Sequence, residues 1–526
     1  MASYRLFLVT CFLLSAAFSY LLHSQDRSDS PIFKSYRPPS PSTLLKRSDV
    51  SYNLLQIFIL ERRAYGGDFL AQHELGLRYL LGEGVEADTI KGAFWIQRAA
   101  EGGLTDALYN LGILYFNGIG VEWNPFKAYR EFLTSAQQGS PEAQYILSMF
   151  LTENLVVPQN WEEAYRWLKE SAGVGYGPAK DALAEFEQRG LGTKRADTEA
   201  KSDSGSASKK PPIKQTLGFV FQDTDIDTSS QADAALLKDA LREASPQLKR
   251  ALGLSKQPSS KLDLDTPGLK VIEDAAEEGS PEALSILGRA YERGVGVKKD
   301  LVLASVYYIR ASRMSSLRAP ALLARMIDRP EYFRELKSRV EQDDPDAEFA
   351  WAALAALKLD YLLAKYQGFI TEPQALEFLT KAVAANHVQA TIELGLCYYA
   401  GRWVPENREQ ALALWNKAAS LGSKEARTRL AALAVRSESD STKLKQAIDV
   451  LESAAQRGSV LAQVALGYCY ETGTWLPKKA GEAARLYRSA AQRGSQDAYF
   501  ALRRMHDRIR PKEKEFQLND FEQLDP

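Results

Sequence analysis

Histidine and cysteine are the side chains best suited to hold a metal or to act as a base or nucleophile, and this sequence has few of either. Its 526 residues include three cysteines and four histidines. The histidines are scattered along the chain, at His23, His73, His387 and His506. A zinc site gathers about three or four ligands at one point. The sequence therefore predicts no metal site, and we expect His73 and His506 on exposed or half-buried helix faces.

Pairs of glycines resemble phosphate-binding loops at first sight. They occur at Gly82-Glu83-Gly84, Gly118-Ile119-Gly120 and Gly294-Val295-Gly296. A phosphate loop follows a strand, whereas these pairs recur at a fixed phase between two predicted helices, which favours turns. The sequence also lacks a P-loop, a G-x-S-x-G motif, an H-E-x-x-H motif and paired C-x-x-C motifs. It predicts neither an enzyme nor a cofactor.

Tryptophans in the loops between predicted helices are the candidate partner-binding residues. Trp403 and Trp475 replace the second turn glycine in two copies of the pattern, and each is followed by an apolar residue and proline. Trp123 and Trp161 also fall in inter-helix loops. Exposed tryptophans are frequent binding hot spots. The competing interpretation is that each ring covers the edge of the next pair of helices.

A repeat of 36 residues must position these side chains. An alanine marks each copy, followed four residues later by leucine and then by a small residue, typically glycine. The 36-residue spacing links the members of each of three series: Ala71, Ala107, Ala143 and Ala179; Ala283 and Ala319; and Ala390, Ala426, Ala462 and Ala498. This spacing marks one face of a helix, and the small residue lets a neighbouring helix approach closely. The predicted fold is all-α, an alpha-alpha superhelix of helix-turn-helix units.

The second helix of each unit carries an aromatic residue and ends at a glycine. Aromatic residues recur in step with the repeat at Trp95, Phe132, Trp167, Trp415 and Tyr487, and we expect them to pack between helices. Cys397 and Cys469 share one repeat position two units apart. Because packed helices are about 8–10 Å apart, these cysteines are too distant for a disulfide and are predicted to be buried core residues.

The repeated pattern resembles the Sel-1-like repeat, a relative of the tetratricopeptide repeat. The resemblance covers most of residues 52–192 and 262–508 and is weak across Ala319–Ala390. It implies a right-handed helical solenoid that binds proteins and assembles complexes, without naming a partner. A eukaryotic branch of the family acts in protein quality control in the endoplasmic reticulum lumen. The absence of any N-x-S/T site in this sequence weakens that alternative.

The resemblance and the composition together suggest two blocks of repeats. The polar stretch Thr193–Lys214 cannot build a core. The predicted organisation is a signal peptide or membrane anchor (1–25), a flexible spacer (26–50), an N-terminal repeat block (51–192), a partly disordered connector with one helix (193–261), a C-terminal repeat block (262–510) and a tail (511–526). A basic cluster near residue 510 is expected to be the solvated face of a final capping helix.

The apolar run Leu6–Leu22 at the N-terminus predicts export. Its length suits either a cleaved signal or an uncleaved anchor. The net charge of −1 excludes a strongly basic nucleic-acid binder. We therefore expect a non-catalytic protein-interaction scaffold or adaptor, periplasmic or anchored facing the periplasm of a bacterium. The alternatives are secretion, a lumenal quality-control adaptor, an envelope regulator that restrains a sensor or a secretion or exopolysaccharide machine, and a cell-wall hydrolase with an unrecognised site within 193–261.

Overall fold

The computed structural model describes residues 45–48, 52, 55–189, 191–192, 266–316, 318–357, 359, 370–437 and 440–518. Helices make up nearly all of the regular structure in these residues, and no strand is found among them. The predicted signal or anchor (1–25), most of the spacer (26–50) and the connector (193–261) lie outside the described residues. None of the described helices is long and apolar enough to cross a membrane.

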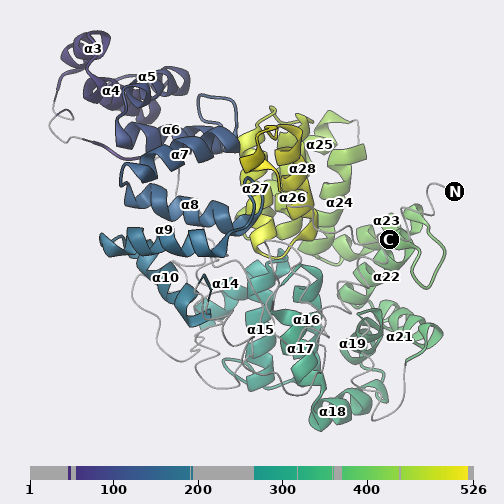
Figure 1. The fold of residues 1–526 in the computed structure, drawn as a ribbon. Helices are drawn as coiled ribbons and strands as arrows, with labels where there is room; N and C mark the ends of the chain where they lie inside the picture. The colour runs from purple at the N-terminus through teal and green to yellow at the C-terminus, as the bar shows by residue number, and fades with distance from the viewer. Residues whose placement is uncertain are drawn as a thin grey trace, which may run out of the picture.

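The N-terminal block is a stack of antiparallel helix pairs (Figure 1). Its helices are α3 (Ile57–Tyr65), α4 (Phe69–Leu81), α5 (Thr89–Glu101), α6 (Thr105–Asn117), α7 (Pro125–Gln137), α8 (Pro141–Glu153), α9 (Trp161–Gly173) and α10 (Gly177–Arg189). The pairs α4–α5, α6–α7 and α8–α9 are complete copies of the predicted helix-turn-helix repeat.

The C-terminal block continues the same pattern over more helices. They are α14 (Thr266–Glu277), α15 (Pro281–Arg293), α16 (Leu301–Arg313), α17 (Ala319–Ile327), α18 (Pro330–Val340), α19 (Pro345–Ala356), α21 (Glu372–Ala384), α22 (Val388–Ala400), α23 (Arg408–Ser420), α24 (Lys424–Ser437), α25 (Ser441–Gln456), α26 (Val460–Thr472), α27 (Ala480–Gln492) and α28 (Gln496–Arg508). The short helices α17 and α18 fall where the sequence pattern is weakest.

Most repeats begin their first helix with a side-chain cap and end it at a left-handed residue, and α8 shows both features. Ser140 precedes α8, and its side chain accepts a hydrogen bond from the backbone N–H of the marker alanine Ala143. A cap of this kind stabilises a helix by about 0.5–2 kcal/mol. The first helix then ends at a left-handed residue, which is glycine in most copies and Asn154 after α8. Glycine adopts this conformation without strain, and asparagine is the best replacement.

The small residue five positions after the marker alanine is where the paired helices touch. A Cβ atom on Gly112 would lie 2.7 Å from a ring carbon of Phe132, and one on Gly467 would lie 2.7 Å from the ring of Tyr487. Trp415 packs against the equivalent glycine in α22. The prediction that all five aromatic positions are in step is wrong for two of them, because Trp95 and Trp167 lie one residue earlier. Both are still buried.

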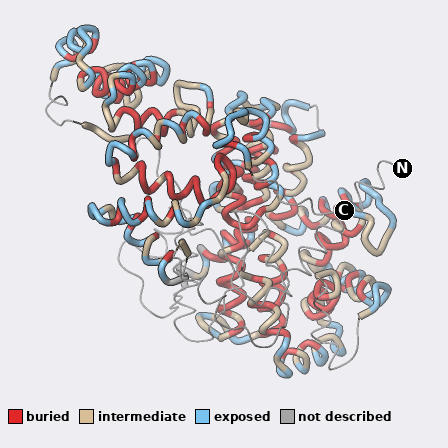
Figure 2. The backbone as a smooth tube through the Cα atoms, in the orientation of Figure 1, coloured by how far each residue is buried: buried red, intermediate tan, exposed pale blue. Residues whose placement is uncertain are grey.

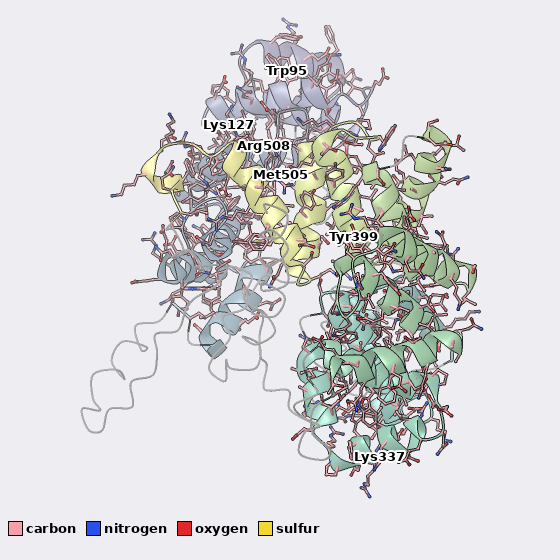
Figure 3. The ribbon with its side chains drawn as sticks, turned by 90° about the vertical axis from the view of Figure 1, so that its right-hand side faces the viewer. Trp95, Lys127, Lys337, Tyr399, Met505 and Arg508 are labelled. Carbon is pink, nitrogen blue, oxygen red and sulfur yellow. The ribbon has the colours of Figure 1, made fainter. Side chains whose placement is uncertain are left out.

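The two blocks are in direct contact through the end of the chain. Helices α27 and α28 lie between the N-terminal block and the rest of the C-terminal block (Figures 1 and 3). Trp123 of the N-terminal block packs in one apolar cluster with Met505 of α28. At Gly481 the backbone of α27 approaches the carbonyl of Asn117 so closely that no Cβ fits between them. The final helix therefore packs one side against the N-terminal block, where the chain is largely buried (Figure 2), while Arg504 and Arg508 on its outer side stay exposed.

Charged and titratable groups lie within this contact. Arg488 pairs with Glu153 at 3.2 Å. His506 is fully buried, its ring 5.3 Å from that of Trp123, so the expectation of an exposed or half-buried His506 is wrong. Burial, together with the charge of Arg488, lowers the pKa of His506 to about 3. The histidine is therefore neutral at pH 7.

The basic cluster at the chain end is solvent-exposed at Arg504 and Arg508, as predicted for a solvated face, and its side chains also form ion pairs and hydrogen bonds within the chain. Arg504 and Arg508 both pair with Glu471. Arg510 donates hydrogen bonds to the carbonyl oxygens of Leu155 and Val156 in the N-terminal block.

Part of the predicted tail also reaches the N-terminal block. The side chain of Phe516 is fully buried in the core of that block, next to Phe126. Arg130 of α7 pairs with Glu513 and Glu515 on either side of it. Residues 513–516 are thus an apolar and ionic attachment to the N-terminal block.

Candidate peptide-binding face

The first helices of the N-terminal repeats place polar side chains together on one surface. His73 and Glu74 come from α4, Asp106 and Asn110 from α6, and Glu142 from α8. His73, Glu74 and Asn110 follow the marker alanines by two or three residues, and both other acids directly precede one. His73, Glu74 and Asn110 are buried, whereas the two other acids are half-buried. We call these five residues the acidic face.

Residues Leu45–Ser48 of the same chain lie on the acidic face, beside α6 (Figure 1). The backbone N–H of Lys46 donates to Asn110 Oδ1 at 2.9 Å, and Asn110 Nδ2 donates to the carbonyl oxygen of Lys46 at 2.8 Å. One buried amide thus satisfies both polar groups of one residue's backbone. Such pairing holds a peptide without depending on its side chains, as a neighbouring strand does in a sheet.

His73 holds the asparagine in place. Asn110 Nδ2 lies 2.7 Å from His73 Nε2, and His73 Nδ1 lies 2.9 Å from the hydroxyl of Ser48. Since the amide nitrogen can only donate, Nε2 accepts and the ring proton is on Nδ1. Burial lowers the pKa of His73 to about 4, which keeps this neutral form at pH 7. The prediction that His73 lies on an exposed or half-buried face is therefore wrong.

Two consecutive basic side chains of the bound segment meet carboxylates. Lys46 Nζ lies 3.1 Å from Asp106 and 2.9 Å from Glu142. Burial alone would lower the pKa of Lys46, but the hydrogen bond to Glu142 and the charges of both acids raise it overall. Arg47 pairs with Glu74 at 2.9 Å and also with Glu83. Four acids in all thus face two cations.

Sequence reasoning missed both the face and its occupant. Residues 45–48 belong to the predicted flexible spacer, but in the structure Asn110 and the acids hold these four residues on the N-terminal block. Two signals were present. Polar residues such as Asn110 interrupt the apolar pattern of a first helix, and Lys46-Arg47 is a basic pair within a proline- and serine-rich stretch. Neither signal identifies the other as its partner.

The C-terminal block has acids at the same repeat positions, but its own repeats neutralise them. Glu282 directly precedes a marker alanine, as Asp106 does, and it pairs with Arg493 at the end of α27. Glu393 follows a marker alanine by three residues, as Asn110 does, and pairs with Arg313 of α16 and with Arg402. These pairs join the first helices of the block to its later ones.

The two turn tryptophans of the C-terminal block share one backbone conformation. Trp403 and Trp475 have φ values of 64° and 68°, the left-handed conformation of the glycines they replace. Trp475 is 47% exposed. Trp403 is half-buried against the core of the block, with the guanidinium of Arg402 5.0 Å from its ring centre. Of these two candidate partner-binding rings, the ring of Trp475 is exposed and that of Trp403 is partly covered by its own block.

The two tryptophans of the N-terminal block contact other parts of the chain. Trp161 is half-buried, with its ring 5.8 Å from that of Phe186. Trp123 is buried between the blocks and is not available to a partner. The four tryptophans do not come together in one site.

The two cysteines of the repeats and His387 have packing and capping roles in the fold. Cys397 and Cys469 are free and fully buried, as predicted. His387 caps α22 by accepting from the N–H of Ala390, and its other ring nitrogen lies 3.0 Å from Asp346. Among the residues that the structure describes, no cluster of histidine, cysteine and acidic side chains is arranged to hold a metal.

Comparison with known proteins places the repeats in a family. The model of the Sel1 repeat matches residues 70–104, 105–140, 141–176, 281–316, 388–423 and 460–495. No curated protein matches this chain. A solved structure of a protective antigen from uropathogenic Escherichia coli, which displays an SLR fold, is 23% identical over 85% of this chain and 82% of its own, with a TM-score of 0.28. A Sel1 repeat protein from Oxalobacter formigenes is 33% identical over 24% of this chain and 97% of its own, with a TM-score of 0.24. The six matched segments include all three helix pairs that build the acidic face, and the chain belongs to the Sel1 repeat proteins.

Proposed function

We propose that this protein is a non-catalytic interaction scaffold, exported to the bacterial cell envelope, that receives a partner protein on its acidic face. Proteins of the Sel1 repeat family generally act in protein–protein interaction. The observation that carries the proposal is the pairing of Asn110 with both backbone groups of Lys46. A buried amide in this arrangement binds peptide backbone, and its polar atoms would be costly to leave unpaired.

Export is supported by the apolar run Leu6–Leu22, which lies outside the described residues. A fusion of residues 1–60 to a reporter enzyme that is active only after export tests this part of the proposal. We expect activity in a bacterial host. A reporter that remains inactive in the cytosol contradicts export but leaves the interaction role standing.

An envelope regulator is the second candidate. It is favoured by one observation, the occupation of the acidic face by the chain's own Leu45–Ser48. A scaffold whose binding face is already filled responds to its partner by exchanging one occupant for another. That exchange can convert binding into a signal to a sensor or a secretion machine.

Crosslinking in the cell tests the interaction role. A photoreactive amino acid is placed at Glu83, at the edge of the acidic face, and in a control at Lys337. Glu83 and Lys337 have side chains that are 48% and 58% exposed, and Lys337 lies at the opposite end of the molecule from Trp95 of the N-terminal block (Figure 3). We expect a discrete crosslinked protein from position 83 alone. The absence of any crosslink from position 83 overturns the role.

A further inference from the structure

We infer that the acidic face binds an extended basic peptide of a partner, and that Leu45–Ser48 is the chain's own competitor for this site. The inference rests on the proposed interaction role and names the chemistry of the ligand. The required ligand is an extended stretch with two consecutive basic residues after an apolar one.

The occupant on the acidic face defines this ligand residue by residue. Leu45 packs against two apolar clusters of the N-terminal block that meet at α6. Lys46 supplies the backbone that Asn110 holds and an ammonium group between two carboxylates, and Arg47 reaches Glu74 on a different helix. Side chains of consecutive residues in an extended chain point in opposite directions. Two adjacent cations can therefore reach acids of α4 on one side and of α6 and α8 on the other.

The charge of the face selects against other peptides. Without the occupant, Glu74 would keep its ion pair with Arg78. The other three acids, Glu83, Asp106 and Glu142, would lose the cations of the bound segment. Burial raises the pKa of Glu74, so this acid in particular is stabilised as a carboxylate by an arriving cation. An acidic or neutral peptide offers no such compensation.

The way in which Leu45–Ser48 is held distinguishes it from a permanent part of the core. All four residues are only partly buried, and the contacts of Lys46 and Arg47 are polar. The other non-repeat segment on the N-terminal block is anchored by the fully buried Phe516. A tethered segment competes at an effective concentration on the order of millimolar. A longer partner peptide with further contacts can displace a four-residue occupant held in this way.

Binding of a labelled peptide to the full chain tests the inference. The probe is a fluorescent ten-residue peptide with the sequence of residues 41–50, followed by anisotropy. We expect weak binding to the wild type. We expect binding at least tenfold tighter to the variant Lys46→Glu/Arg47→Glu, whose own segment is repelled by the face. A control variant, Lys337→Glu/Arg408→Glu, makes the same change in net charge at exposed positions of the C-terminal block and should bind as the wild type does.

Two further arms identify the site and the chemistry. Adding Asp106→Asn/Glu142→Gln to the tight-binding variant should remove most of the gain, because these half-exposed acids hold Lys46. The same peptide with both basic residues replaced by glutamate should not bind.

Three results would overturn the inference. They are equal affinities for the wild type and the Lys46→Glu/Arg47→Glu variant, binding of the glutamate peptide, and a wild-type dimer that this variant loses, which would mean that the segment belongs to a second copy. If crosslinks from position 83 form in the cell while the peptide arms fail, the scaffold role stands and only this ligand chemistry is wrong.

Discussion

The N-terminal and C-terminal blocks use the same repeat positions to carry acids, and they neutralise those acids in different ways. In the C-terminal block, Glu393 is paired by Arg313 and Arg402, which belong to the block itself. In the N-terminal block, Asp106 and Glu142 are paired by Lys46, which lies outside the repeats. The longer block coils far enough to bring its own later helices opposite its first ones. The shorter block does not, so its acids remain available to another segment.

Within one solenoid, some acids thus form permanent ion pairs inside the fold, and others can pair with a segment that binds to it. The side chain of Glu393 is 1% exposed, whereas those of Asp106 and Glu142 are more than 20% exposed. Charge pairs of the first kind join helices within the C-terminal block, as Arg313 of α16 and Glu393 of α22 do. Those of the second kind can exchange partners at small cost, because each carboxylate is still reached by water.

The largest expected effect comes from breaking a structural pair in the C-terminal block. Burial opposes the charge on Glu393, but Arg313 and Arg402 lower its pKa and keep it ionised. Glu393→Ala leaves both guanidinium groups without this partner, which should cost about 3–5 kcal/mol of unfolding free energy in urea denaturation. The matched control Glu406→Ala breaks an exposed pair with Arg408 and should cost less than about 1 kcal/mol. Similar losses for the two variants would remove the distinction between the two kinds of charge.

Packing inside a repeat is common to both blocks and should respond next most strongly. Gly112→Ala pushes a methyl group against the ring of Phe132 and should lower the unfolding free energy by about 1–3 kcal/mol. Gly173→Ala is the control, since its new methyl group meets open space and its backbone is not left-handed. Helix propensity should leave that variant unchanged or raise its stability by up to about 1 kcal/mol. Equal urea midpoints would show that Gly112 is not where the helices touch.

Acid should weaken the contact between the two blocks. The pKa of His506 is about 3 in the folded chain and near 6.5 when exposed. Between these values the unfolded state binds more protons, so stability falls as the pH drops below about 6.5. At pH 4.5 this contribution is a loss of roughly 2–3 kcal/mol relative to pH 7. His506→Gln cannot titrate and should lose correspondingly less on acidification. Parallel stability curves for the variant and the wild type would show that His506 does not report on this contact.

The smallest effect on stability is expected from Lys46 in the bound segment Leu45–Ser48, although this residue should have the largest effect on peptide binding. Lys46→Ala removes pairs with two carboxylates, Asp106 and Glu142, that are both more than 20% exposed, which should change the unfolding free energy by less than about 1 kcal/mol. The same change should open the acidic face to peptide. A loss of several kcal/mol of unfolding free energy in thermal or urea denaturation would mean that Leu45–Ser48 is a permanent part of the fold, as Phe516 is.

The repeats could be predicted from the sequence because each depends on neighbours within about 36 residues. The marker alanines and the close approach at Gly112 follow from the period and from local backbone chemistry. So does Asn386, which stands where other second helices end at a glycine and adopts the same left-handed conformation. The site could not be predicted in the same way. Lys46 and Asn110 are 64 residues apart, and only one of them belongs to a repeat. No periodicity relates two such residues.

The burial of the histidines was also beyond the sequence pattern. The helical positions of His73 and His506 are compatible with a solvated face. Residues from elsewhere in the chain cover them, Ser48 in one case and Trp123 in the other. For the turn tryptophans, the sequence predicted the position in the turn but not the exposure of the ring. Their replacement of a glycine was visible in the sequence, but only the packing of each turn determines that Trp475 is exposed and Trp403 is partly covered.

Hydrogen exchange at the backbone amide of Lys46 shows whether Leu45–Ser48 leaves the acidic face when a basic peptide binds. This N–H is bonded to the buried Asn110, so it should exchange slowly in the full chain alone. Addition of a saturating basic peptide should make it exchange as fast as an unstructured amide, while the amides within α6 stay protected. Protection of the Lys46 amide that persists at saturating peptide would show that Leu45–Ser48 is a fixed part of the fold and does not compete with a partner.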